Sequence, residues 1–296
     1  MASRGIEAVR EHLKKLPPPD SLTIEERRAQ YERAERVFPT PPEVKIERVT
    51  APVAPAEWLR PPAAEAGRVV LYLHGGGYVI GSPRSHRHLA SAIASAAGAS
   101  ALLLDYRRAP EDPFPAAVDD AVACYRWLLE QGTTPGRIVI GGDSAGGGLT
   151  VATLVALREA GLTLPAGAVC ISPWTDLTFS GESYKTKAAV DPIVSRPGID
   201  KMARAYLGAT DPRTPLASPL FAELGGLPPL LIHVGGDEVL LDDAVQLADR
   251  ARAAGVPVSL EVWERMIHVW HWFLPMLDEA ERAVQVIGEF CRKQTG

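Results

Sequence analysis

A serine flanked by glycines stands where an apolar run gives way to a helical pattern. The stretch RIVIGGDSAGGGLTVATLVAL begins at Arg137, and its Gly142–Gly146 segment fits the pattern G-x-S-x-G. In that pattern a sharp turn from strand to helix lifts the serine hydroxyl above a sheet, where it can attack a carbonyl carbon. Ser144 is therefore the candidate nucleophile of an acyl transfer. The alternative is a glycine-rich turn that only caps a helix.

A second glycine cluster follows an earlier apolar run. The stretch VVLYLHGGGYVIGS places His74-Gly75-Gly76-Gly77 directly after residues 69–73. Loops of this type supply backbone N–H groups beside the N–H of the residue that follows the serine. When an alkoxide attacks an ester carbonyl, such fixed donors stabilise the negative charge that collects on the carbonyl oxygen. The candidate oxyanion donors are therefore the N–H groups of Gly76, Gly77 and Ala145.

A serine hydroxyl also needs a base, and the chain order serine, acid, histidine places that base after Ser144. Four of the seven histidines precede the serine, and His233 stands inside an apolar run, where a core histidine is expected. His268 and His271 remain, in the stretch ERMIHVWHWF. His268 directly follows the last predicted strand, which favours it as the base, with His271 as the alternative.

The acid is sought in HVGGDEVLLDD, which follows the seventh predicted strand and holds four carboxylates. Asp242 and Asp243 are explained by the start of the next helix, because carboxylates are favourable at a helix N-terminus. The choice between Asp237 and Glu238 stays open on the residues alone.

The elements that must position these residues follow from the hydrophobic pattern. Short apolar runs predict eight strands, which start at Val44, Ala56, Val69, Ser100, Arg137, Gly167, Leu230 and Val258. Longer amphipathic patterns predict helices after His88, from Ala116, after Ser144, from Asp242 and over residues 276–294. Alternation of this kind predicts a mainly parallel sheet with helices on both faces. Residues 1–42 and 178–210 fall outside the alternation, and both are expected to cover one end of the sheet.

Composition narrows the function classes. The chain has 296 residues, of which 46% are hydrophobic and 23% charged, and its formal charge is -5, so it offers no basic field for nucleic acid. Its three cysteines are far apart in apolar contexts, which predicts reduced core residues and no zinc or disulfide framework. The amphipathic N-terminus lacks the apolar run of a secretion signal, and no long apolar run follows, so a cytoplasmic protein is expected.

Taken together, these motifs resemble the bacterial hormone-sensitive-lipase-like esterases (family IV) of the α/β-hydrolase superfamily. The resemblance spans nearly the whole chain and is carried by HGGGY at His74, DYRRAPEDPFPAAVDD at Asp105, GDSAGG at Gly142, SPWTDL at Ser172 and MIHVW at Met266. The family's acid usually stands in a D-P-L-x-D pattern, and the matching register here is EVLLD at residues 238–242. That register selects Glu238, and its departures from the pattern keep Asp237 as the alternative acid.

The resemblance implies a serine carboxylesterase for short to medium acyl chains that needs no metal or cofactor. Ser144 would attack, His268 would act as base, Glu238 would orient the imidazole, and Gly76, Gly77 and Ala145 would bind the oxyanion. It also implies an α/β-hydrolase core of residues 43–177 and 211–296 under a helical cap of residues 1–42 and 178–210. Tyr78, Trp174 and Met202 are the expected pocket residues, with core packing as the alternative.

Two other readings of function remain. A lactone, amide or carbamate hydrolase could use the same triad, because a fold does not decide the acyl donor. A non-catalytic binding module would be expected to have lost some of the motif residues, which are all present.

The last predicted strand, VSLEVW from Val258, is expected at an edge of the sheet. Open edges invite pairing, and relatives of this type commonly dimerise through that strand, so a homodimer is expected.

Overall fold

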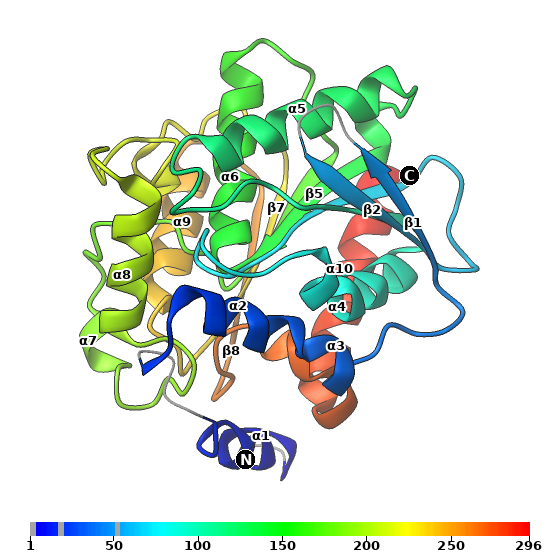
Figure 1. Ribbon diagram of the computed structural model, residues 1–296. Helices are drawn as coiled ribbons and strands as arrows, with labels where there is room; N and C mark the ends of the chain where they lie inside the picture. The colour runs from blue at the N-terminus through cyan, green and yellow to red at the C-terminus, as the bar shows by residue number, and fades with distance from the viewer. Residues whose placement is uncertain (1–3, 17–20, 51–53) are drawn as a thin grey trace.

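A mixed eight-stranded sheet forms the centre of the computed structural model, which describes residues 4–16, 21–50 and 54–296 (Figure 1). The strands are β1 (Lys45–Thr50), β2 (Pro55–Arg60), β3 (Val69–Leu73), β4 (Ser100–Leu104), β5 (Ile138–Asp143), β6 (Gly167–Ile171), β7 (Leu230–Gly235) and β8 (Val258–Trp263). Their order across the sheet is β1-β2-β4-β3-β5-β6-β7-β8. β2 is antiparallel to both its neighbours, and the remaining pairs are parallel. The fold class and all eight predicted strands are confirmed.

Helices cover both faces of the central strands, which are therefore mostly apolar. Every residue of β3 to β7 is buried. The helices α4 (Pro83–Ala97) and α10 (Asp278–Thr295) pack on one face, and α5 (Ala116–Glu130), α6 (Ala145–Glu159) and α9 (Leu241–Ala253) pack on the other. Two apolar cores result, one on each side of the sheet.

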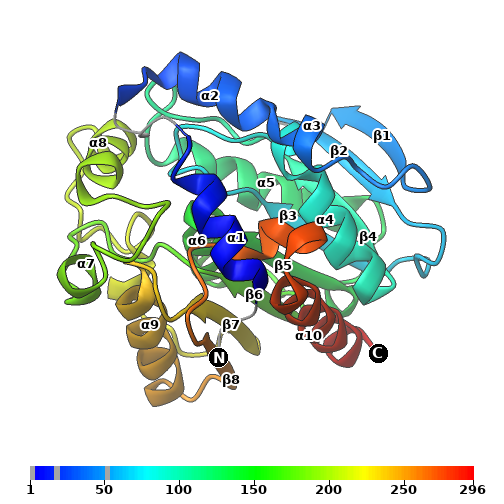
Figure 2. The ribbon, with the colours of Figure 1, turned by 90° about the horizontal axis from the view of Figure 1, so that it is seen from below.

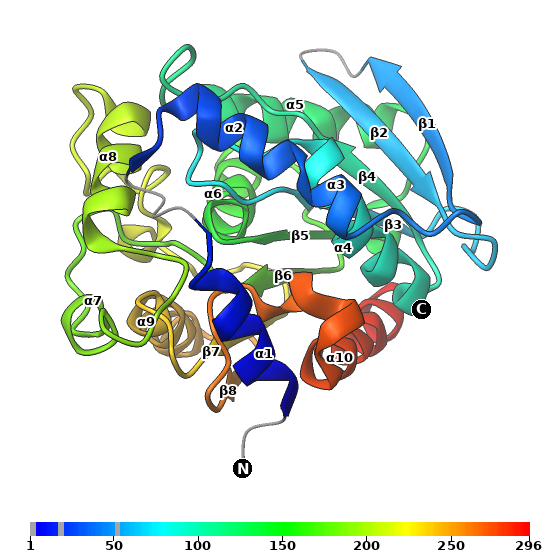
Figure 3. The same ribbon diagram turned by 60° about the horizontal axis from the view of Figure 1, so that its bottom comes forward.

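The remaining helices gather near the carboxyl ends of the parallel strands, where Figures 2 and 3 show α1 in front of the sheet with α2 and α8 beside it. They are α1 (Arg4–Leu13), α2 (Ile24–Glu32), α3 (Ala34–Val37), α7 (Ser183–Thr186) and α8 (Arg196–Leu207). The part of the chain that the structure describes also contains the short 3₁₀ helices η2 (Pro135–Arg137), η3 (Pro219–Phe221) and η4 (Trp270–Met276). A third apolar cluster joins α1 and Phe38 to η4 and the start of α10.

The start of α4 follows local capping and not hydrophobic periodicity. α4 begins at Pro83, ahead of the predicted start after His88. Ser82 accepts from the N–H of Ser85, whose side chain accepts in return from the N–H of Ser82, and the proline occupies the first turn. The polar first turn of α4 therefore belongs to the helix although it carries no apolar stripe.

Close backbone contact explains the glycines around Ser144. A Cβ at Gly146 would overlap the carbonyl oxygen of Leu73 in β3, and a Cβ at Gly142 would overlap the same oxygen. These two glycines therefore let α6 and β5 lie against β3 without a side chain between them.

We expect Gly146→Ala to lower the free energy of unfolding by about 2 kcal/mol or more, because the added methyl forces packed backbone apart. Urea denaturation measures the change. Gly136→Ala is the matched control, since Gly136 is exposed and a Cβ there meets open space. Equal unfolding midpoints for the two variants would contradict the close-contact explanation.

Candidate active site

Ser144 occupies a strained position between β5 and α6. Its backbone has φ 55° and ψ -120°, a conformation that costs a non-glycine residue about 1–3 kcal/mol. Hydrogen bonds hold it there. Its N–H donates to the carbonyl oxygen of Ile171 at 2.8 Å, and its carbonyl accepts from the N–H of Trp174 at 2.9 Å. The strain points the hydroxyl away from the helix and toward the loops at the end of the sheet.

One chain of hydrogen-bonding groups links three side chains. His268 Nε2 lies 3.0 Å from Ser144 Oγ, and His268 Nδ1 lies 3.0 Å from Glu238 Oε2. Glu238 is fully buried, and its other carboxylate oxygen accepts from the N–H of Gly235 at 3.3 Å. The acid follows β7, the histidine follows β8, and the serine follows β5, so parallel strands bring all three to one end of the sheet.

Charge around the imidazole decides its proton affinity. Burial alone would lower the pKa of His268, but the hydrogen bond and charge of Glu238, helped by Asp191 and Asp143, raise it above the ordinary value of 6.5. Burial raises the pKa of Glu238, and the bond to His268 opposes that rise. His268 is therefore a stronger base than a free histidine.

Asp237, the alternative acid, faces the other way. Its carboxylate binds Arg10 at 2.8 Å and lies 3.8 Å from Lys187, and about a quarter of its side chain is exposed. No hydrogen bond joins it to His268 in the part of the chain that the structure describes. The structure thus brings Glu238, and not Asp237, to the imidazole.

His271, the alternative base, is buried away from the serine. His271 Nε2 lies 3.1 Å from His233 Nδ1, and both rings pack around Trp270. Burial lowers the pKa of His233 to about 3 and that of His271 well below its usual range. The two rings form a neutral core pair, as expected for His233.

The candidate oxyanion donors sit on a turn shaped by glycine. Gly76 and Gly77 have φ of 114° and 61°, and the carbonyl of Gly76 accepts from the N–H groups of Val79 and Ile80. The N–H groups of Gly76, Gly77 and Ala145 donate no hydrogen bond to any residue that the structure describes. Gly76 lines the same cavity as Ser144, so the turn presents unused donors near the hydroxyl.

Asp143 lies beside the nucleophile and is a residue that the sequence motifs do not mark as functional. Its buried carboxylate accepts from the hydroxyl of Tyr72 at 2.8 Å and from the N–H of Gly75 at 3.1 Å, and it lies 3.5 Å from His86 Nε2. Burial would raise its pKa, but His86 and Tyr72 outweigh that effect and lower it. Asp143 therefore ties the glycine turn to the strand that carries Ser144. Its place within GDSAGG was the only signal in the sequence.

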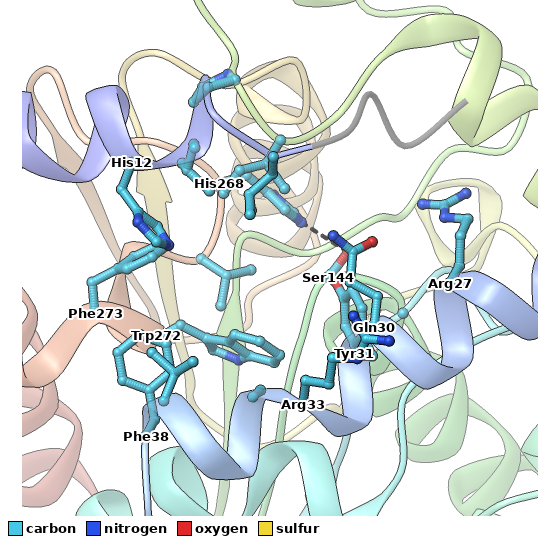
Figure 4. Close-up of a pocket in the computed structure, with 18 of the residues that line it drawn as sticks. His12, Arg27, Gln30, Tyr31, Arg33, Phe38, Ser144, His268, Trp272 and Phe273 are labelled. Atoms are coloured by element: carbon cyan, nitrogen blue, oxygen red, sulfur yellow. Dashed lines mark hydrogen bonds between the residues drawn. The ribbon is translucent and has the colours of Figure 1, made fainter. Parts of the chain in front are cut away.

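A cavity of about 790 Å³ opens from Ser144 and His268 beneath the N-terminal helices. Figure 4 shows His268 directed at Ser144, Trp272, Phe38 and Phe273 grouped on one side, and Arg27 on the other. Its apolar lining includes Leu13, Leu16, Leu22, Phe38, Ile193, Val269, Trp272 and Phe273, and its polar lining includes His12, Arg27, Gln30 and Arg33. The site can therefore hold an apolar group next to the hydroxyl.

The three expected pocket residues lie elsewhere. Tyr78 stacks on Tyr206 with ring centroids 3.8 Å apart, and Trp174 is fully buried. Met202 packs behind Gly77 and lines a separate hollow of about 60 Å³. None of the three is among the described residues that line the large cavity. The sequence predicts that residues 1–42 cover the site, but it does not identify which of their side chains line the cavity, because α2 has no apolar stripe to show which face points inward.

Across residues 4–16, 21–50 and 54–296, no three His, Cys, Asp or Glu side chains are grouped so that they could hold a metal ion. Cys124, Cys170 and Cys291 are buried and free. Of the helices that the structure describes, none has the length and apolar character needed to cross a membrane.

Comparisons with known proteins identify the family to which this fold belongs. The family profile of the alpha/beta hydrolase fold matches residues 70–272. An acetyl-hydrolase of Streptomyces hygroscopicus is 53% identical over 296 residues, covering 100% of this chain and 99% of the relative.

Two solved structures are similarly close. The esterase EstE5, in a crystal soaked with p-nitrophenyl butyrate, is 50% identical, with a TM-score of 0.96 over 99% of each chain. An esterase from the bacterial hormone-sensitive lipase family is 52% identical, with a TM-score of 0.95 over 100% of each chain. With such likeness along its whole length, the chain belongs to the hormone-sensitive-lipase-like esterases of the α/β-hydrolase fold and is a carboxylic ester hydrolase.

Proposed function

We propose that the protein hydrolyses short to medium acyl esters through a Ser144–His268–Glu238 triad and an acyl-enzyme intermediate. The observation that carries the proposal is the continuous chain of 3.0 Å contacts from Ser144 Oγ through His268 to Glu238. A serine hydroxyl, an imidazole and a buried carboxylate in this order are the parts that nucleophilic acyl transfer needs.

In the acylation step His268 Nε2 takes the proton from Ser144 Oγ as the oxygen attacks the ester carbonyl. The imidazolium that forms is stabilised by Glu238, which accepts from Nδ1–H. Negative charge on the carbonyl oxygen is bound by the N–H groups of Gly76, Gly77 and Ala145. His268 then gives its proton to the leaving alcohol, and Ser144 holds the acyl group.

In the deacylation step water takes the place of the alcohol. His268 accepts a proton from the water, whose oxygen attacks the acyl-enzyme carbonyl, and the same backbone donors bind the second oxyanion. When the tetrahedral intermediate breaks down, His268 returns the proton to Ser144 Oγ and the carboxylic acid is released.

Residues 1–42 and 178–210 serve, on this proposal, as the cap of the site, over a core of residues 43–177 and 211–296. The cavity lining supports this division, since it draws on α1 to Phe38 and on Pro192 and Ile193. The relative named an acetyl-hydrolase and the EstE5 crystal soaked with a butyryl ester support a short to medium acyl group. Tyr78, Trp174 and Met202 would support the pocket from behind the glycine turn.

We expect Ser144→Ala and His268→Ala to lower kcat/KM by about 10³- to 10⁶-fold, because each removes a part that the others depend on. Glu238→Ala should lower it by a smaller but still large factor. Asp237→Ala is the matched control, and its kcat/KM should stay within about tenfold of the wild type. Hydrolysis of p-nitrophenyl butyrate by the folded variants measures this. A large loss of kcat/KM in Asp237→Ala, with none in Glu238→Ala, would overturn the choice of Glu238.

A substrate panel tests the reaction class. We expect p-nitrophenyl acetate, butyrate and octanoate to give the highest kcat/KM and the laurate ester a much lower one, because a bounded cavity limits chain length. A small lactone, a carbamate and an anilide complete the panel. Faster turnover of any of these three would favour the alternative acyl donors, and no turnover of any member would favour a binding module.

We also propose a homodimer that pairs β8 with its copy. β8 is an edge strand, and half of the Val262 side chain is exposed. Leu230 N–H donates to Pro257 O, and Gly236 N–H donates to Trp263 O, so the odd-numbered residues of β8 bond to β7. The alternation of a parallel ladder then directs the N–H groups of Leu260 and Val262 to the open edge.

Light scattering is expected to give a mass near twice the chain's 31.8 kDa. Val262→Pro should shift that mass toward the monomer because it removes an outward donor. Val262→Thr, which keeps the N–H and the branched side chain, should leave the dimer intact. A wild-type mass near 31.8 kDa would contradict the proposal.

A further inference from the structure

The two residues that flank Glu238 in sequence are both hydrogen-bonded to segments outside the core. On one side, Arg10 of α1 binds Asp237 at 2.8 Å and also donates to the carbonyls of Val190 and Arg265. On the other side, the N–H of Val239 donates to Asp191 Oδ2 at 2.9 Å. The neighbours of Glu238 in sequence are thus fixed by α1 and by the segment that contains Asp191.

Ser183 makes a second set of hydrogen bonds to the turn that carries Glu238. The hydroxyl of Ser183 in α7 donates to the carbonyl of Val239 at 2.6 Å and accepts from the N–H of Asp242 at 3.1 Å. Both polar backbone groups of Val239 are therefore bound by residues 183–191, which are distant from it in sequence. The position of Glu238 depends on these bonds because Val239 is the next residue of the chain.

Asp191 is a carboxylate whose hydrogen bonds come from backbone N–H groups. Its Oδ1 accepts from the N–H groups of Ile193 and Val194, both at 2.9 Å, and its Oδ2 accepts from Val239. No lysine or arginine forms an ion pair with it among the residues that the structure describes. Burial raises the pKa of Asp191, and the nearby His268 opposes that rise. His268 is the charged side chain that acts on the pKa of this carboxylate.

We propose that Asp191 is a positioning residue of the triad, which holds the acid turn through Val239 and favours the imidazolium of His268 by its negative charge. The inference rests on the proposed function and adds a residue from outside the core to it. The charged groups that face His268 are then Glu238 from the turn after β7, Asp143 from the end of β5, and Asp191. Asp191 also raises the pKa of Glu238 by like-charge repulsion.

The dependence of kcat/KM on pH measures the effect of this charge, because kcat/KM falls on the acidic side as the base of the free enzyme becomes protonated. The acidic limb is the part of the profile where this fall occurs, and its midpoint reports the pKa of the base. In the wild type we expect the limb midpoint above 6.5, since the pKa of His268 is raised. Asp191→Asn keeps the size of the side chain and loses its charge. We expect its limb to move down by about half a unit or more and its kcat to fall by about tenfold, with KM changed by less than about threefold.

Two further variants complete the experiment. Asp191→Glu restores the negative charge, so the midpoint of the acidic limb should return toward the wild-type value. A purely structural role of Asp191 would not require this return. Glu182→Gln is the charge-matched control, because Glu182 lies in the same part of the chain but is exposed and paired with Lys185. Its limb should coincide with that of the wild type. Circular dichroism confirms that each variant is folded before its profile is measured.

The outcomes separate the two proposals. An Asp191→Asn limb at the wild-type midpoint, whatever its kcat, would overturn the role given to Asp191. A wild-type protein that hydrolyses no ester would instead overturn the proposed function. A shift of equal size in Glu182→Gln would show only the effect of net charge and would likewise overturn the assignment.

Discussion

The strained backbone of Ser144 is the constraint on which the rest of the site depends. A residue with φ 55° and ψ -120° is stable only where its surroundings over-determine it, and here β3, β5, β6 and α6 all press against the turn. Gly142 and Gly146 are required because the carbonyl oxygen of Leu73 leaves no room for a Cβ at either position. The same compression places the N–H of Ala145 at the start of a long helix, where its partial positive charge favours an anion.

Near the carboxyl ends of the parallel strands, four carboxylates accept hydrogen bonds from backbone N–H groups. Asp143 accepts from Gly75, Glu238 from Gly235, Asp191 from three N–H groups, and Asp243 from Thr175 and Asp176. Each of these bonds fixes a loop at the carboxyl end of the sheet, so the carboxylates organise the site as well as charge it. Asp243 illustrates the cost of burial, which raises its pKa to about 8.

Much of this could be predicted from the sequence, because strands, glycine turns and chain order obey local rules. The eight strands and the positions of Ser144 and His268 follow from apolar runs and from what must come after each run. Glu238 required the family register, since spacing alone could not separate it from Asp237. The roles of Asp143 and Asp191 depend on contacts between distant segments, and the large cavity depends on how a polar helix docks. Neither Tyr31 nor Gln30 carries a pattern that would mark it as lining that cavity.

In the proposed mechanism, Ser144 is a nucleophile that His268 activates. The most direct measurement is the mass of the intact protein after reaction with an organophosphate, followed by mapping of the labelled peptide. We predict a single adduct on Ser144 and labelling that slows greatly in the folded His268→Ala variant, because the hydroxyl has lost its base. An adduct on another residue, or labelling of Ser144 at the same rate without His268, would contradict the account.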